Sequence, residues 1–461
     1  MLNKYIGNKS FYKNVLKLAI PIMLQNAITS FVNMLDNIMV GKLSTNEMTG
    51  VAVANQLIFV FTFCIFGAVA GAGIFGAQFF GKGDHEGVRY TFRFKLIIGM
   101  IVAVMGIAIF WFLGNPLINL YLKGEGSSAD KLEILSYAKN YLNIMLIGLI
   151  PFTISQCYSA TLRECDRSLL PMFAGIIAVA VNLIFNFGLI YGKLGFPELR
   201  SEGAAIATVI SRFTELLILV VVTALTAKRS PFIKGAFKSL YMPYKLSKEI
   251  FKKGMPLMLN EILWASGMAA MSQCYSIKGI DVVAGNNIAQ TYFNVFSVAF
   301  TAVGISIGII LGQQLGKGSK NEVLDTARKL ITFSLIISFV AGALYFVCAS
   351  FIPELYNTSD TVRHIAKRLM QIGAITLPLE AFAQASYFTL RSGGKTFIVF
   401  LFDSAFMWFI SIPVAFVLGR YSGLTISWIY LICQLLISLK CILGYIFVKR
   451  GIWIKNIVDD L

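Results

Sequence analysis

Residues 50–83 read GVAVANQLIFVFTFCIFGAVAGAGIFGAQFFGKG, and the run from Gly50 to Phe80 contains no charged side chain. A transmembrane helix needs about 20 predominantly apolar residues. Membrane β-strands are shorter, and apolar and polar residues alternate along them, which they do not do here. The stretch therefore predicts a helix that crosses a membrane.

The same stretch has a counterpart in the second half of the chain. Gly81-Lys82-Gly83 matches Gly316-Lys317-Gly318, and further residues match at the same offset without a gap. The other pairs at this offset are Pro21 and Pro256, Gly50 and Gly285, Gly73 and Gly308, Gln78 and Gln313, Arg93 and Arg328, and Tyr121 and Tyr356. Chance rarely keeps one register over so long a stretch, so the sequence indicates an internal repeat.

The whole chain has the composition of a membrane protein. Charged residues make up 14% of it, whereas soluble domains carry roughly 25%. Apolar runs of spanning length lie near residues 15–40, 50–80, 92–114, 134–161, 168–192, 203–226, 250–276, 284–313, 326–350, 364–390, 396–418 and 423–448. We therefore predict an all-α integral membrane protein with twelve transmembrane helices in two homologous six-helix lobes around a central cleft. The lobes are residues 1–227 and 250–461, and residues 228–249 form a cytoplasmic loop between them.

The net charge of +17 has two possible explanations. A strongly basic soluble domain often binds nucleic acid, but in a membrane protein Lys and Arg retain loops on the cytoplasmic side. Most of the basic residues, including Arg93 and Lys95, are assigned to loops on one side of the predicted spans. We therefore expect a multi-pass protein of the plasma membrane with both termini cytoplasmic, no nucleic acid partner and no cleavable signal peptide.

Ionisable residues inside the predicted spans need a physical reason, because each costs about 2.5–3.5 kcal/mol at the bilayer centre. The candidates are Asp36, Arg212, Glu215, Glu261, Glu380, Asp403 and Lys440. Arg212 and Glu215 lie three residues apart and are expected to neutralise each other in part. Lys440 is expected to extend its ammonium group toward the membrane surface.

Polar residues share one face of the first span. Asn26, Thr29, Asn33 and Asp36 follow one another at spacings of 3, 4 and 3 residues, which places them on one side of a helix. Such a stripe lines a cavity or contacts another helix, because facing lipid is costly. In the fifth span Asn182 and Asn186 are i, i+4 neighbours whose oxygens suit a hard cation.

The second half carries comparable stripes. Glu261, Trp264, Met268, Met271 and Tyr275 share one face of the seventh span. An acid beside aromatic and methionine side chains suits a bulky organic cation, although ordinary helix packing would explain the apolar members. The remaining stripes are Glu380, Gln384 and Tyr387 in the tenth span, and Asn287, Gln290, Asn294, Ser297 and Thr301 in the eighth.

These residues resemble a known family as a set. The segment from Asp36 through Asn37-Ile38-Met39-Val40-Gly41 is similar to the opening signature of the multidrug and toxin extrusion (MATE) transporters. The resemblance covers essentially the whole chain. It extends to Gln78 and Gly81, to Asn182 and Asn186, to Gly203-Ala204-Ala205-Ile206-Ala207-Thr208, and to Pro378 with Arg391-Ser392-Gly393.

The resemblance implies a transporter that exports organic cations in exchange for sodium ions or protons. It places Asp36, Asn182, Asn186 and Thr208 at the coupling-ion site of the first lobe. Glu261 and Glu380 match the acidic positions of the second lobe, with Tyr292 nearby. Many members have Asp where this chain has Asn186, and some have Asp in place of Glu380, so either lobe is a candidate to carry the ion.

From the stripes and the resemblance together we assign candidate site residues. Asp36, Glu261 and Glu380 would be ligands of the metal if the coupling ion is sodium. The expected substrate contacts are Asn33, Trp264, Met268, Gln290, Tyr292, Asn294 and Gln384. No catalytic residue and no cofactor are expected, and the predicted partners are a small organic cation and membrane lipid, with the protein a monomer.

Other functions fit the sequence less well. The segment from Gly76 to Lys82 resembles the motif of a phosphate-binding loop, in which the lysine is followed by Ser or Thr. Here Gly83 follows Lys82, so the motif is incomplete. An ion gradient would therefore supply the energy. The two lobes would rock against each other, so that the cleft between them opens alternately to the two sides of the membrane. The alternative is a flippase of lipid-linked oligosaccharides from the same superfamily, whose diphosphate would need a cationic cavity. A channel, a receptor and an enzyme fit less well.

Overall fold

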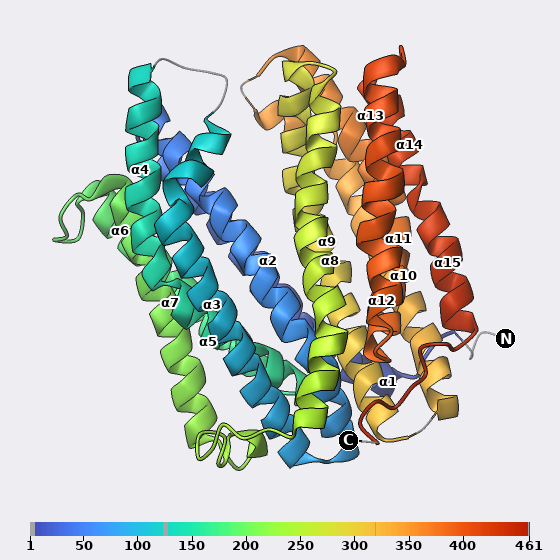
Figure 1. Ribbon diagram of the computed structural model, residues 1–461. Helices are drawn as coiled ribbons and strands as arrows, with labels where there is room; N and C mark the ends of the chain where they lie inside the picture. The colour runs from blue at the N-terminus through green and yellow to red at the C-terminus, as the bar shows by residue number, and fades with distance from the viewer. Residues whose placement is uncertain (1–4, 123–127, 319, 357, 460) are drawn as a thin grey trace. The chain divides into compact units, whose positions relative to one another are not determined.

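The computed structural model describes residues 5–122, 128–318, 320–356, 358–459 and 461, without the side chains of residues 33, 34, 37, 38, 128, 320 and 321. Within these ranges the regular structure is helical throughout (Figure 1). The helices of the first half are α1 (Lys9–Gly41), α2 (Thr45–Lys82), α3 (His85–Tyr121), α4 (Ser128–Ile147), α5 (Leu149–Glu164), α6 (Leu169–Tyr191), α7 (Arg200–Leu225) and η2 (Pro231–Ile233). This agrees with the predicted all-α class.

The second half repeats the pattern with more interruptions. Its elements are α8 (Tyr244–Ser276), α9 (Ile280–Gly316), α10 (Lys320–Cys348), η3 (Ile352–Leu355), α11 (Asp360–Ser392), α12 (Thr396–Phe400), η4 (Leu401–Ala405), η5 (Met407–Ser411), α13 (Ile412–Tyr421), α14 (Ile426–Leu435) and α15 (Ile437–Lys449). The segments η4 and η5 are π-helical. A π-turn holds an extra residue, and such turns often mark functional positions.

The helices are long enough for a membrane. In the described chain, nine helical stretches are long and apolar enough to cross a membrane. A tenth span is added if α4 and α5, which are bent by 47° relative to each other, are counted as one. Two further helices, α8 and α11, have 33 residues each but begin with charged stretches. Including them gives the predicted twelve, a count that stays a prediction.

The chain divides into two compact units. Unit 1 consists of Met1–Met23, Ala77–Asp84 and Met255–Leu461, and unit 2 of Leu24–Gly76 and His85–Gly254. The two ends of α1 and of α2 therefore belong to different units. The predicted lobe boundaries at residues 227 and 250 remain a prediction.

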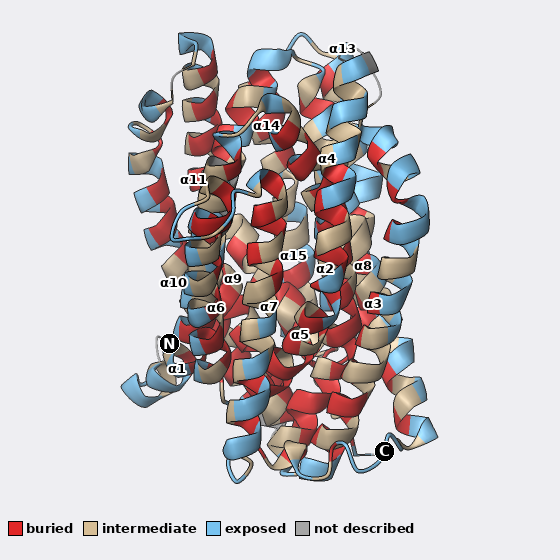
Figure 2. Ribbon diagram, turned by 90° about the vertical axis from the view of Figure 1, so that its left-hand side faces the viewer, coloured by how far each residue is buried: buried red, intermediate tan, exposed pale blue. Residues whose placement is uncertain are grey.

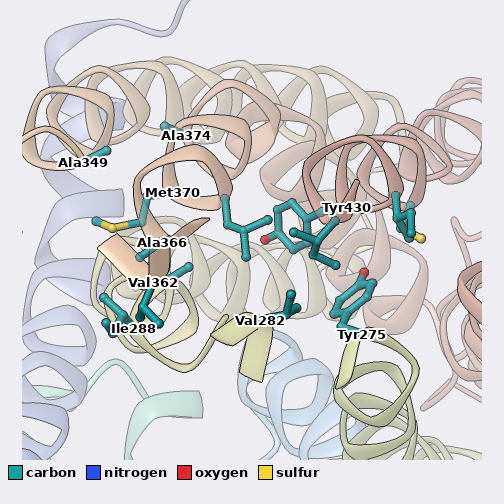
Figure 3. Close-up of a cluster of buried hydrophobic side chains, with 14 of the residues drawn as sticks. Tyr275, Val282, Ile288, Ala349, Val362, Ala366, Met370, Ala374 and Tyr430 are labelled. Carbon is teal, nitrogen blue, oxygen red and sulfur yellow. The ribbon is translucent and has the colours of Figure 1, made fainter. Parts of the chain in front are cut away.

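A large cluster of apolar and tyrosine side chains in unit 1 comes from α8, α9, α10, α11, α13 and α14 (Figure 3). Tyr275 and Tyr430 meet edge to face with ring centroids 5.8 Å apart, a favourable aromatic geometry. Tyr345 is buried and donates its hydroxyl hydrogen to the carbonyl of Ala289 at 2.9 Å. Buried phenols need such partners, because an unpaired polar group is costly.

The repeated glycines allow a close crossing within unit 1. A Cβ on Gly81 would overlap the backbone of Gln313, and one on Gly316 would overlap the backbone of Gln78. The ends of α2 and α9 therefore pack backbone against backbone, which only glycine permits. This contact gives the pair Gly81 and Gly316 a physical reason to recur in both halves of the sequence.

The buried Gln78 side chain fastens the C-terminal segment of unit 1. Its Nε2 donates to the carbonyls of Ser392 at 3.0 Å and Lys455 at 3.3 Å, and its Oε1 accepts from the amide of Ile457 at 2.8 Å. Trp453 in the same segment is fully buried. The residues after α15 are thus packed into unit 1.

Two basic residues of unit 2 are not in a loop, so that part of the sequence assignment was wrong. Lys95 is fully buried within α3, where its Nζ donates to the carboxylate oxygens of Glu164 at 2.7 and 2.5 Å and to Thr161 at 3.0 Å. Arg93 is also buried, and its guanidinium donates to three backbone carbonyls at 2.7–2.8 Å. Those carbonyls belong to residues 235, 236 and 241 of the predicted inter-lobe loop. Charged groups can therefore be buried when each finds partners.

Exposed apolar side chains are abundant, as a lipid solvent allows. Buried and exposed positions occur along the same helices (Figure 2). On α3, Trp111 is 66% and Phe112 is 78% exposed. Water would penalise such surface, but the hydrocarbon core of a membrane would not.

Candidate functional site

Four side chains of unit 2 form a continuous hydrogen-bonded chain. Asn186 Nδ2 donates to Asp36 Oδ1 at 2.6 Å and to Asn182 Oδ1 at 3.0 Å. Asn182 Nδ2 donates to Thr208 Oγ1 at 3.3 Å, and Thr208 donates to the carbonyl of Ala204 at 3.0 Å. The structure thus brings together all four residues that the resemblance implied, from α1, α6 and α7.

The chain of polar groups leaves oxygen atoms for a ligand. Asn186 and Asn182 are 1% and 4% exposed, yet Asn186 Oδ1 has no hydrogen-bond partner among the described residues. Asp36 is half-buried, and the partner that the structure gives its carboxylate is a neutral amide. One carboxylate with neighbouring amide and hydroxyl oxygens suits a small hard cation or a proton.

Unit 1 holds a second network around Glu261. Tyr387 donates its hydroxyl hydrogen to Glu261 Oε1 at 3.3 Å, and Asn260 Nδ2 lies 3.5 Å from the same hydroxyl. Asn260 Nδ2 also donates to Asp403 Oδ2 at 3.2 Å, so the network reaches from α8 through α11 to the π-helical η4. Ser404 donates its amide and hydroxyl hydrogens to Asn260 Oδ1, at 3.2 and 2.8 Å.

Lys440 does not extend toward the membrane surface as the sequence suggested. Its Nζ donates to Asp403 Oδ1 at 2.7 Å, and the two side chains are only 13% and 17% exposed. The expectation failed because a lysine in the middle of a helix can be stabilised by a buried acid as well as by lipid headgroups. Asp403, which the sequence left undecided, is its partner.

Glu380 lies next to this ion pair. Cys441 Sγ donates to the carbonyl of Leu379 at 3.3 Å, which places the neighbours of Lys440 and Glu380 in contact. The charges of Lys440 and Asp403 both act on Glu380. The acidic positions that the resemblance implied in the second half therefore belong to one polar region of unit 1.

The residues expected to contact the substrate lie on different helices, and some of them hydrogen-bond to one another. Asn33 lies outside the described side chains. Gln290 donates to Asn294 at 3.1 Å along α9, and Thr301 donates to Gln384 at 3.4 Å between α9 and α11. Trp264 and Met268 are half-buried on α8.

The place of Tyr292 at the site of the second lobe stays a prediction. The phenol that hydrogen-bonds Glu261 is Tyr387. Tyr292 instead meets the ring of Tyr356 at 6.5 Å and packs against the hydrophobic cluster of unit 1. These two tyrosines are not distinguished by sequence spacing, because the spacing does not show which helix faces which.

The acids do not gather into a metal cluster. In the part of the chain that the structure describes, no three His, Cys, Asp or Glu side chains are placed to hold one metal ion. A cation at either network would therefore be held by one or two carboxylates together with neutral oxygens.

Comparison with known proteins decides the family. The MatE family model matches residues 21–187 and 256–417. Both matches begin at the paired prolines Pro21 and Pro256, and together they cover more than half of the chain. The chain belongs to the MatE family. It is accordingly a multi-pass membrane transporter and not an enzyme, as the sequence predicted.

Relatives extend the match over nearly the full length. A probable multidrug resistance protein NorM of Thermotoga maritima is 29% identical, over 97% of this chain and 94% of its own. A MATE transporter of Vibrio cholerae has a TM-score of 0.85 at 16% identity, covering 97% and 98% of the two chains. An outward-facing multidrug resistance MATE transporter has a TM-score of 0.85 at 18% identity, covering 97% and 98%. At this identity the structures share the fold with this MatE protein.

Sequence reasoning missed Asn260 and the pairing of Asp403 with Lys440. Asn260 precedes Glu261, but it received no attention because a single amide in a span is common. Asp403 and Lys440 lie 37 residues apart, and only the packing of α15 against the π-helical segment pairs them. The sequence did offer one signal for this pair, because Asp403 and Lys440 are an acid and a base in consecutive predicted spans.

Proposed function

We propose that this protein is a multidrug efflux transporter that exports organic cations across the plasma membrane in exchange for sodium ions or protons. Both termini would be cytoplasmic, and the protein would act as a monomer. Its relatives are named as multidrug resistance proteins, which supports multidrug export. The positive charge that we assign to one side of the spans supports the orientation.

The single observation that carries this proposal is the network around Asp36. A carboxylate in a membrane helix is costly, and here its partner is the neutral Asn186 amide at 2.6 Å. Because this partner carries no charge, the site could take up either a sodium ion or a proton. The unpartnered Asn186 Oδ1 would supply a second ligand.

Driving force is available from the membrane potential and from ion gradients. One charge that crosses about 100 mV releases about 2.3 kcal/mol, or roughly fifty-fold in concentration. Binding of the coupling cation at Asp36, Glu261 or Glu380 would compete with the organic cation and release it outside. The lipid-linked oligosaccharide flippase is the weaker candidate, because the networks centre on carboxylates, which repel a diphosphate.

The test is ethidium efflux from cells that express the chain. Wild-type protein should lower cell-associated ethidium, and Asp36→Asn, Glu261→Gln and Glu380→Gln should each impair export at equal expression. Asn140→Leu is a matched control, because Asn140 makes an exposed hydrogen bond to Glu202 in unit 2. Export at the wild-type rate by all three acid variants would contradict the proposal.

A further inference from the structure

Lys440 occupies a setting that has the chemistry of a binding site for an organic ammonium ion. Its Nζ lies 2.7 Å from Asp403 Oδ1 and 5.4 and 5.9 Å from the ring centroids of Phe402 and Phe406. A carboxylate with aromatic faces is the combination that recognises ammonium ligands. The ligand in this site is a side chain of the protein itself.

The acid of this site is held in place from both sides. Asp403 lies in the π-helical η4, and its second oxygen accepts from Asn260 at 3.2 Å. Ser404, the next residue, donates its amide and hydroxyl hydrogens to oxygen atoms of Asn260. The carboxylate is therefore held by two groups, the Asn260 amide and the Lys440 ammonium group.

A second acid is close to the same ammonium group. The Cys441 thiol meets the Leu379 carbonyl, so Lys440 and Glu380 are on adjoining turns of α15 and α11. Glu380 is subject to the charges of Lys440 and Asp403, and Glu261 to those of Arg391 and Asp403. Through Asn260 and Tyr387, Asp403 is also linked by hydrogen bonds to Glu261.

We propose that Lys440 is a built-in cation of unit 1, which sets the net charge that Glu380 and Glu261 offer to a transported cation. Held by Asp403, the ammonium group cancels the charge of that acid and stabilises Glu380 while no cation is bound. Glu261, which also has the charge of Arg391 acting on it, is affected through Asp403. Lys440 is thus a specificity-determining residue rather than a ligand. The inference deepens the proposed function and rests on it.

Opposite substitutions should change cation affinity in opposite directions. Lys440→Met keeps the length of the side chain and removes its charge, so the acids should bind a cation more tightly. Asp403→Asn leaves the ammonium group uncancelled, so binding should weaken. At an effective dielectric constant of about 20, each change should be on the order of tenfold in affinity.

The experiment measures binding of ethidium to the purified full-length protein by fluorescence anisotropy, with melting temperature recorded for each variant. Lys440→Arg should keep near-wild-type affinity, because the charge is retained. The double variant Lys440→Met with Asp403→Asn should return toward wild type. Lys449→Met is the matched control, since Lys449 is exposed in the last turn of the same helix.

The outcomes separate this inference from the proposed function. If Lys440→Met and Asp403→Asn melt at lower temperature but bind ethidium like wild type, the pair is structural only and the inference is overturned. If Lys440→Met does not fold, weaker binding by Asp403→Asn still supports it and unchanged binding overturns it. If wild-type protein binds ethidium but does not export it in cells, the proposed function fails while the affinity changes still test the role of Lys440. If wild-type protein binds no ethidium, both are contradicted.

Discussion

Asn186 Nδ2 lies 2.6 Å from Asp36 Oδ1, although the two residues are 150 positions apart in the chain. The amide belongs to α6 and the acid to α1, and both lie in unit 2. A neutral donor stabilises the carboxylate without cancelling its charge. The structure therefore gives Asp36 a partner that carries no charge, so a cation or a proton would not have to displace a basic residue.

Asn186→Leu should abolish most export while the protein still folds. The substitution removes the donor to Asp36 and the free Oδ1, leaving the acid without this partner. We expect at least a tenfold loss of ethidium export and about 1–3 kcal/mol of stability. Export rate and melting temperature are compared with those of Asn140→Leu, and wild-type export by Asn186→Leu would show that the hydrogen bond is dispensable.

Lys95→Met should be strongly destabilising. Lys95 is fully buried, and its loss leaves the Glu164 carboxylate without the ammonium group that neutralises it. Breaking a buried pair costs about 3–5 kcal/mol, whereas removing both charges costs less. Thermal unfolding in detergent should therefore show partial recovery in Lys95→Met with Glu164→Gln.

The control for that experiment is a partly exposed pair. Lys329 and Asp325 form an i, i+4 ion pair at 2.6 Å on α10, and their side chains are 21% and 44% exposed. Lys329→Met should cost about 0.5 kcal/mol or less. If Lys95→Met and Lys329→Met lowered the free energy of unfolding by the same amount, burial of the Lys95 pair would make no difference to stability.

Gln78→Leu should loosen the C-terminal segment. It removes three hydrogen bonds to backbone groups, two of them in residues 455–457, which should cost about 2–3 kcal/mol. Limited digestion with trypsin reads this directly, because Lys455 lies in the segment. Lys82→Ala is the control, since its ion pair with Asp459 is exposed, and cleavage at the wild-type rate in Gln78→Leu would contradict the proposed fastening.

Gly81→Ala should disturb the crossing of α2 and α9. The added methyl group would overlap the backbone of Gln313, which cannot move aside as a flexible side chain would. We expect a loss of about 1–3 kcal/mol, measured as a lower melting temperature. Gly423→Ala, where the new methyl group meets open space, should change the melting temperature little. Similar results for both would mean that the close approach is not required.

Part of this structure could be predicted from sequence for clear physical reasons. The run from Gly50 to Phe80 predicted a membrane helix because hydrocarbon demands apolar residues, and it lies within α2. Asp36, Asn182, Asn186 and Thr208 were grouped by family resemblance. Their hydrogen-bonded chain could not be seen in the sequence, since its order depends on how three helices face one another.

The errors have a common cause. Lys95 was placed in a loop and Lys440 at the membrane surface, because hydropathy alone assigns charged residues to water. In the structure each ammonium group is neutralised by an acid from another helix, Glu164 or Asp403. Such pairing joins residues 69 or 37 positions apart, beyond the reach of helical periodicity.

The most direct test of the central claim is ethidium transport into or out of vesicles that contain the purified protein, with sodium and proton gradients imposed separately. Our account predicts that at least one gradient drives ethidium in the opposite direction to the ion, and that Asp36→Asn reduces this transport strongly. Gradient-independent transport, or gradient-driven transport that is unchanged in Asp36→Asn, Glu261→Gln and Glu380→Gln, would contradict it.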